Sequence, residues 1–128
     1  MGQAVVEGLN ALESRKAIYK QHGIAYYRPW VFLLTDGGPT DVNSEYWLKA
    51  KQNVRQGEDK RSFSFFAVGV EGADMGRLSE LSVREPLKLK GLEFRKMFEW
   101  LSASQQAVSR STPGTAVQLA PPVGWTEV

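Results

Sequence analysis

The chain contains no cysteine and a single histidine, His22. The lack of cysteine excludes disulfide bonds and thiolate metal sites. With one histidine, a Ser-His-Asp triad or a multi-histidine zinc site would have to depend on His22 alone. That residue lies at the end of a predicted helix, and no nucleophile or orienting acid is evident beside it. We therefore expect His22 to have no catalytic role.

Long apolar runs and a strong charge excess are also missing. No run approaches the ~20 residues of a membrane span, and the N-terminus lacks the basic start and apolar block of a signal peptide. Sixteen Lys and Arg against fourteen Asp and Glu give a net charge of +2, which favours neither nucleic acid nor membrane as a partner. Basic pairs such as Lys60-Arg61 are scattered and are expected on solvated faces. We predict a cytoplasmic protein.

What the chain does contain is an alternation of helical and strand patterns over 128 residues, the length of one domain. Apolar spacing predicts helices over 3–21, from Asn43 or Ser44 to a solvated turn at 56–61, around 75–81, and over 92–109. Strands are predicted at 30–34, 63–70 and 86–89. Alternating strands and helices predict an α/β fold with a parallel sheet and helices on both faces.

The run from Trp30 to Leu34 is the most apolar of the three strands and predicts a central strand, buried on both faces. The weaker strand at 86–89 alternates and predicts an edge. No strand precedes Trp30 to pair with its other side, and three strands are few for a doubly wound sheet. The pattern therefore predicts the C-terminal half of a larger domain.

The last helix and the end of the chain complete this domain. Phe94 and Phe98 follow helical spacing and are expected in the core, with Trp100 pointing outward. Residues 1–112 are predicted to form the partial domain. Residues 113–128 are predicted to form an extended, Pro- and Gly-rich surface tail that Trp125 anchors.

The loop after the first strand, TDGGPTD, carries two acids that could bind a metal, run a reaction or close a turn. An aspartate after a strand readily accepts backbone N–H bonds, so Asp36 alone fits a turn former or a metal ligand. Asp41 lies close to Asn43 and Ser44 at a predicted helix start, which favours helix capping over metal binding.

Three longer stretches resemble a known family. YYRPWVFLLTDGGPTD, FSFFAVGVEGADMGRL and MFEWLSASQQAVSRSTPG are similar to the von Willebrand factor A (vWA) domain. The similarity is greatest to its bacterial TerY-like branch, which is associated with tellurium resistance and stress gene clusters. This resemblance implies the C-terminal part of a doubly wound, Rossmann-like vWA sheet with about three strands and four helices.

The family holds Mg²⁺ in a metal-ion-dependent adhesion site made from an Asp-x-Ser-x-Ser loop, a threonine and a third-loop aspartate. The resemblance assigns that third aspartate to Asp36, with Thr35, Gly37, Thr40 and Asp41 as neighbouring binding residues. The other two loops have no counterpart in this sequence, and one exposed carboxylate binds Mg²⁺ weakly. We therefore expect no cofactor in this chain, and Mg²⁺ only in a full-length relative.

The resemblance and the strand pattern together predict a non-enzymatic protein-interaction module in a bacterial stress response. Its truncated sheet would associate through the strand from Trp30 to Leu34, with a second copy or with a partner protein. Two alternatives stay open. One is a metal-dependent phosphate-ester hydrolase that uses Asp36 and Asp41. The other is a short protein that competes with a full-length vWA relative.

Overall fold

The computed structural model describes residues 1–91, 93–112, 117–119, 122 and 125–126. In this part of the chain, four helices alternate with three strands that form one all-parallel sheet of order β1-β2-β3. The predicted α/β class is confirmed, and the architecture is consistent with a Rossmann-like fold. The elements are α1 (Gly2–Gln21), β1 (Trp30–Thr35), α2 (Glu45–Asp59), β2 (Ser64–Gly69), α3 (Met75–Leu81), β3 (Leu87–Lys88) and α4 (Phe94–Ser109).

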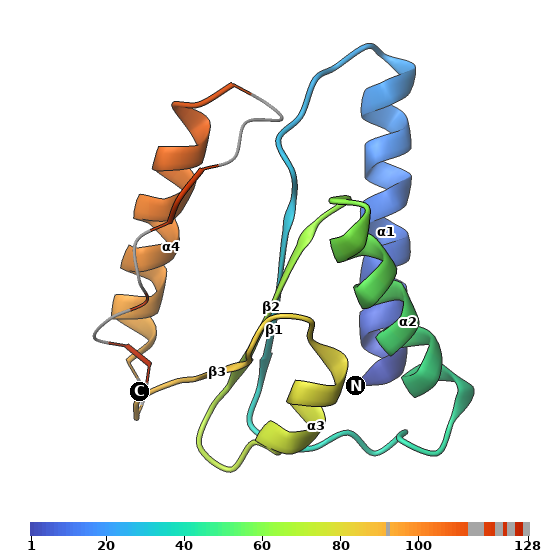
Figure 1. Ribbon diagram of the computed structural model, residues 1–128, viewed down its shortest axis with the longest axis vertical. Helices are drawn as coiled ribbons and strands as arrows, with labels where there is room; N and C mark the ends of the chain where they lie inside the picture. The colour runs from blue at the N-terminus through green and yellow to red at the C-terminus, as the bar shows by residue number, and fades with distance from the viewer. Residues whose placement is uncertain (92, 113–116, 120–121, 123–124, 127–128) are drawn as a thin grey trace.

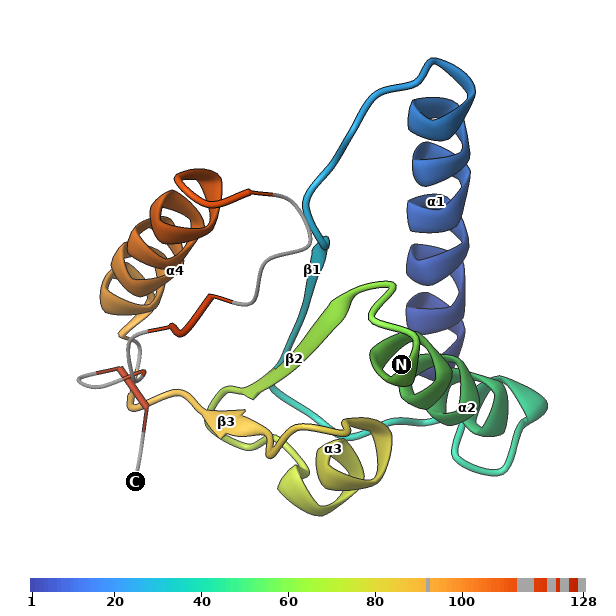
Figure 2. The same ribbon diagram turned by 45° about the horizontal axis from the view of Figure 1, so that its top comes forward.

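The sheet divides the helices into two layers, with α1, α2 and α3 on one side and α4 on the other (Figures 1 and 2). Side chains of a strand alternate between the two faces. Phe65 and Ala67 of β2 therefore join the core under α1–α3, while Val68 joins the core under α4. The α1–α3 core consists of Val5, Val6, Leu9, Trp47, Ala50, Val54, Phe63, Phe65, Ala67, Leu78 and Leu81.

The opposite face is built from aromatic rings. Phe32 and Phe66 stack with their ring centroids 4.9 Å apart, and Trp30 lies 5.5 Å from Phe66. Trp100 of α4 lies 6.3 Å from Phe66 and 5.5 Å from Trp125. Aromatic rings at these separations stabilise the fold by more than the burial of their apolar area alone. Trp100 thereby connects α4 to the sheet through ring contacts.

The strand order leaves one side of β1 unpaired among the described residues, as the lack of a preceding strand predicted. β2 is the middle strand and is almost entirely buried, whereas five of the six β1 residues are half-buried and Leu34 is exposed. Among the described residues β1 pairs only with β2. The prediction that this strand is buried on both faces is therefore wrong for this sheet, in which β1 is an edge strand. The two-residue β3 occupies the other edge, as its alternation predicted.

The solvated turn predicted at 56–61 is wrong, because α2 continues to Asp59. Gly57 suggested a break, but it is buried inside the helix. A Cβ on Gly57 would lie 2.0 Å from Cε1 of Phe63, so the glycine makes room for that ring. The next residue, Glu58, is also turned inward and hydrogen-bonded. A glycine is required at position 57 by the packing of Phe63, and not by a turn of the chain.

Two aromatic assignments on α4 are reversed. Phe98, predicted in the core, is 56% exposed. Trp100, predicted to point outward, contacts the rings of Trp30, Phe66 and Trp125. The apolar stripe of α4 therefore runs through Phe94, Met97 and Trp100 on the side of the sheet.

Trp125 is fully buried against α4 and β3. Its carbonyl accepts a hydrogen bond from Lys90 N–H at 2.7 Å, and the neighbouring Thr126 forms an antiparallel bridge with Leu89. The extended conformation predicted for 113–116, 120–121, 123–124 and 127–128 lies outside the described residues. Among the helices that are described, none combines the length and apolar character needed to cross a membrane.

Candidate functional site

The predicted metal-site residues lie in the loop after β1, but they do not form a cluster of metal ligands in the described structure. Thr35 Oγ1 accepts a hydrogen bond from Gly37 N–H at 3.3 Å. The Gly37 carbonyl accepts one from Asp74 N–H at 3.2 Å, so this loop lies beside the loop after β2. Asp36 and Thr40 are exposed. Within the described ranges, no group of three or more Asp, Glu, His or Cys side chains could hold a metal ion.

Asp41 is a capping residue, but for a different helix from the one predicted. Its carboxylate accepts hydrogen bonds from the backbone N–H of Gly2 at 3.1 Å and of Gln3 at 3.0 Å, at the start of α1. The N-cap of α2 is Ser44, whose side chain makes no capping hydrogen bond. Ser44 Oγ instead donates to the Asp41 carbonyl at 2.7 Å. A capping partner 39 residues away in sequence is invisible to local pattern reading.

The electrostatics of Asp41 follow from this position. Burial alone would raise the pKa of the Asp41 carboxyl. The two backbone N–H donors of α1 and the nearby N-terminal ammonium outweigh burial, and the pKa is lowered from the usual 3.8. Asp41 is therefore an ionised cap at neutral pH, engaged by α1.

The free edge of β1 is the second candidate site. The Pro29 carbonyl accepts from Ser64 N–H, and the Thr35 carbonyl accepts from Val70 N–H, so odd-numbered residues direct their backbone groups toward β2. Backbone groups of successive strand residues point to opposite sides. Trp30, Phe32 and Leu34 therefore direct their N–H and C=O groups away from the sheet, and nothing in the described part of the chain pairs with them.

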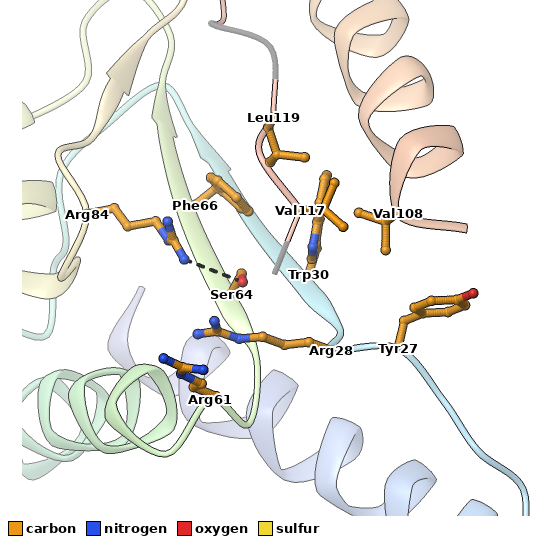
Figure 3. Close-up of a pocket in the computed structure, with 10 residues that line it drawn as sticks. All are labelled: Tyr27, Arg28, Trp30, Arg61, Ser64, Phe66, Arg84, Val108, Val117 and Leu119. Atoms are coloured by element: carbon orange, nitrogen blue, oxygen red, sulfur yellow. Dashed lines mark hydrogen bonds between the residues drawn. The ribbon is translucent and has the colours of Figure 1, made fainter. Parts of the chain in front are cut away.

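The third candidate is a cavity that the sequence did not reveal. It has a volume of about 550 Å³ and lies at the amino end of the sheet, between the starts of β1 and β2 and the last turns of α4 (Figure 3). Three arginines, Arg28, Arg61 and Arg84, line it, and its described lining contains no acid. The remaining lining residues are Tyr27, Trp30, Ser64, Phe66, Val108, Val117 and Leu119.

Glu58 lies beneath these arginines and holds two of them. Its side chain is only 7% exposed. One carboxylate oxygen accepts from Arg28 Nη2 at 2.9 Å, and the other accepts from Arg84 Nε at 3.1 Å and from Phe65 N–H at 2.6 Å. A buried carboxylate with all these donors is a strong, orienting partner for guanidinium groups. Glu58 thus fixes Arg28 and Arg84 at the cavity wall.

Tyr27 closes one side of the same region. Its hydroxyl lies 3.1 Å from the Ser109 carbonyl and 2.7 Å from the Ser111 carbonyl, both at the C-terminal end of α4.

No protein-family model, curated protein or solved structure matches this chain. The vWA resemblance and the site residues that it implies therefore rest on the quoted sequence stretches alone.

Sequence reading missed the cavity because its charged residues come from distant segments. Arg28 precedes β1, Arg61 follows α2 and Arg84 follows α3. The prediction that Lys60-Arg61 lies on a solvated face holds for exposure, but Arg61 also lines the cavity. One signal was present: an apolar strand that starts next to an arginine, Arg28-Pro29-Trp30.

Proposed function

We propose that this chain is a protein-association module, of vWA type as its sequence resemblance suggests, and that β1 pairs antiparallel with β1 of a second copy. The observation that supports this proposal is the unpaired edge of a strand that is apolar on both faces. The stress-response context remains part of the proposal and comes only from the resemblance.

The β1 edge has none of the usual protection against pairing. Proteins commonly guard an edge strand with lysine, proline, a bulge or a very short strand. β1 is six residues long, reads WVFLLT and contains neither a charge nor a proline. By contrast, β3 at the opposite edge is only two residues long and contains Lys88. Association at β1 is therefore favoured over association at β3.

A symmetric pairing has a natural register. A two-fold axis at Phe32 would set Phe32 against its own copy and Trp30 against Leu34 of the second chain. All three residues direct their backbone groups outward, so about six new N–H···O=C bonds would form. Continuing outward, Arg28 would fall opposite Asp36 of the second chain. Opposite charges at the two ends favour this antiparallel register over a parallel one.

Side chains add to the backbone pairing. Leu34 is 43% exposed, and Trp30 and Phe32 are half-buried. Their side chains share the α4 face of the sheet, so an added strand would cover apolar surface on that face. Burying apolar area contributes roughly 25 cal/mol per Å². A six-stranded sheet of two copies would then have only the short β3 strands at its edges.

The test uses two substitutions at one position. Leu34→Pro removes an outward N–H while the β2-facing groups of Leu33 and Thr35 remain, so the monomer should fold. Leu34→Thr removes apolar surface but keeps the N–H. We expect sedimentation equilibrium to show a dimer for the unaltered chain, a weaker dimer for Leu34→Thr and a monomer for Leu34→Pro. Circular dichroism would check that all three are folded.

A stable monomer of the unaltered chain at every concentration would refute the proposal. So would an undiminished dimer of folded Leu34→Pro, because association would then not use the outward backbone groups of β1.

A further inference from the structure

We infer that the cavity at the amino end of the sheet binds a small organic oxyanion, a phosphate or a carboxylate, that carries a flat apolar ring. The inference rests on other observations than the association proposed for β1, although Arg28 and Trp30 belong to both regions. It rests on the charge of the cavity, on the backbone conformation of Arg61 and on the division of the lining into a cationic and an apolar side.

The cavity wall carries more positive charge than its described ion pairs neutralise. Among the described residues, Glu58 is the single carboxylate that bonds to these arginines, and it bonds to Arg28 and Arg84 but not to Arg61. The three positive charges of the guanidinium groups are therefore accompanied by the single negative charge of Glu58. Guanidinium groups present several donors in a plane and bind phosphate or carboxylate oxygens in pairs. Because Glu58 already fixes Arg28 and Arg84, little side-chain entropy would be lost when an oxyanion binds to them.

Arg61 shows that a side chain is kept here against the preference of the backbone. α1 and α2 end in the same motif, in which two N–H groups beyond the helix return to its last carbonyls. The residue that takes the left-handed conformation is Gly23 after α1, with φ 67°, and Arg61 after α2, with φ 55°. Glycine adopts this conformation freely, whereas arginine does so at a cost in stability.

The side chain of Arg61 does not recover that cost within the described structure. It is exposed and forms no ion pair or hydrogen bond with any described residue. Its neighbour Lys60 is equally exposed but does not line the cavity. A residue in an unfavourable conformation at a cavity wall is a reason to assign it a function. Binding of an anion would use the free guanidinium group.

The other side of the cavity suits a flat ring. Figure 3 shows the three guanidinium groups on one side, near Ser64, and Trp30, Val108 and Val117 on the other. Arg84 already lies over the ring of Phe66, 5.2 Å from its centroid, so the cationic side of the wall meets an aromatic ring. The volume of about 550 Å³ is in the range of small-molecule sites.

Isothermal titration of the full chain with phenyl phosphate, benzoate and phenol tests the inference. We expect saturable binding of phenyl phosphate or benzoate and none of phenol. Tighter binding of phenyl phosphate identifies a phosphate site, and tighter binding of benzoate identifies a carboxylate site. The decisive variant is Arg61→Gly, which should weaken binding at least about tenfold, because a charge-assisted hydrogen bond is lost. The same variant should melt at a higher temperature, so lost binding could not be caused by unfolding.

Lys60→Gln is the matched control, since it removes the same charge one residue away and should leave affinity unchanged. Arg84→Gln provides a second variant in the wall and should also weaken binding. The inference is overturned if neither anion saturates, if phenol binds as tightly as the anions, or if Lys60→Gln weakens binding as much as Arg61→Gly.

Discussion

The two faces of the sheet are built on different principles. Under α1–α3, side chains from α1, α2, β2 and α3 interlock in one core of mostly aliphatic residues. Under α4, aromatic rings span the space between sheet and helix, and the arginine-lined cavity opens beside them. The first face is organised for close packing. The second face leaves room, and the charges in it are held by one buried carboxylate. From this comparison we expect the first face to contribute most of the stability, and we propose binding at the cavity of the second.

The largest effect is expected from truncating the first core. Leu78 of α3 is completely buried among the residues of that core. Leu78→Ala should lower the free energy of unfolding by about 2–5 kcal/mol, through lost burial and the cavity left behind. Urea denaturation followed by circular dichroism would measure it. Leu48→Ala, on an exposed position of α2, is the control and should change little.

Trp125→Ala tests whether the two faces of the sheet unfold separately or as one cooperative unit. Trp125 is as buried as Leu78 but lies on the α4 face. We expect it to loosen α4 while α1–α3 unfold at nearly the unaltered urea concentration. Tryptophan fluorescence and circular dichroism should then report separate transitions. Coincident transitions at a much lower urea concentration would show that the α4 face contributes as much to global stability as the other.

An intermediate effect is expected from Glu58→Gln, at the junction of the two faces. The amide keeps the shape of the side chain but loses the charge that holds Arg28 and Arg84. Hydrogen bonds to a charged group are worth more than neutral ones, so a loss of about 2 kcal/mol is expected. Glu80→Gln is the control. Its ion pair with Arg77 is exposed, and removing it should cost less than about 1 kcal/mol. Equal effects would contradict the orienting role of Glu58.

The smallest effect belongs to Asp41→Asn, which tests the cap of α1. Because the folded pKa of Asp41 is lowered, its carboxylate stabilises the fold above the usual value of 3.8 and loses this effect as the pH falls through the lowered pKa. We expect Asp41→Asn to cost about 1 kcal/mol at neutral pH. The difference from the unaltered chain should vanish in acid. Asp36→Asn, in the same loop, serves as control. A difference that persisted below the lowered pKa would contradict a charged cap.

Local patterns were sufficient for most elements, because each is specified by residues close in sequence. The helical spacing that begins with Val5 and Leu9 predicted α1, and the apolar run FSFFAVGV predicted β2. The failures share a cause. Gly57 looked like a turn because its reason is the ring of Phe63, and Asp41 looked like a cap of α2 because its partners are at the start of α1.

The candidate sites divide in the same way. The unpaired edge of β1 was predictable, since it depends on the order of strands along the chain. The cavity was not, because it exists only when Arg28, Arg61 and Arg84 meet in space. Arg28 beside an apolar strand is a local signal, but nothing in the sequence shows that Arg61 and Arg84 lie near it in space.

The bridge between Leu89 and Thr126 has a mechanical consequence. Together with the bond from Lys90 N–H to the Trp125 carbonyl, it brings the two ends of the segment that contains α4 to one point beside β3. A pulling force applied after Thr126 would therefore load β3 and Trp125 before it reached α4. The force would act on β3 at the edge of the sheet, and α4 would bear no load until the bridge between Leu89 and Thr126 broke.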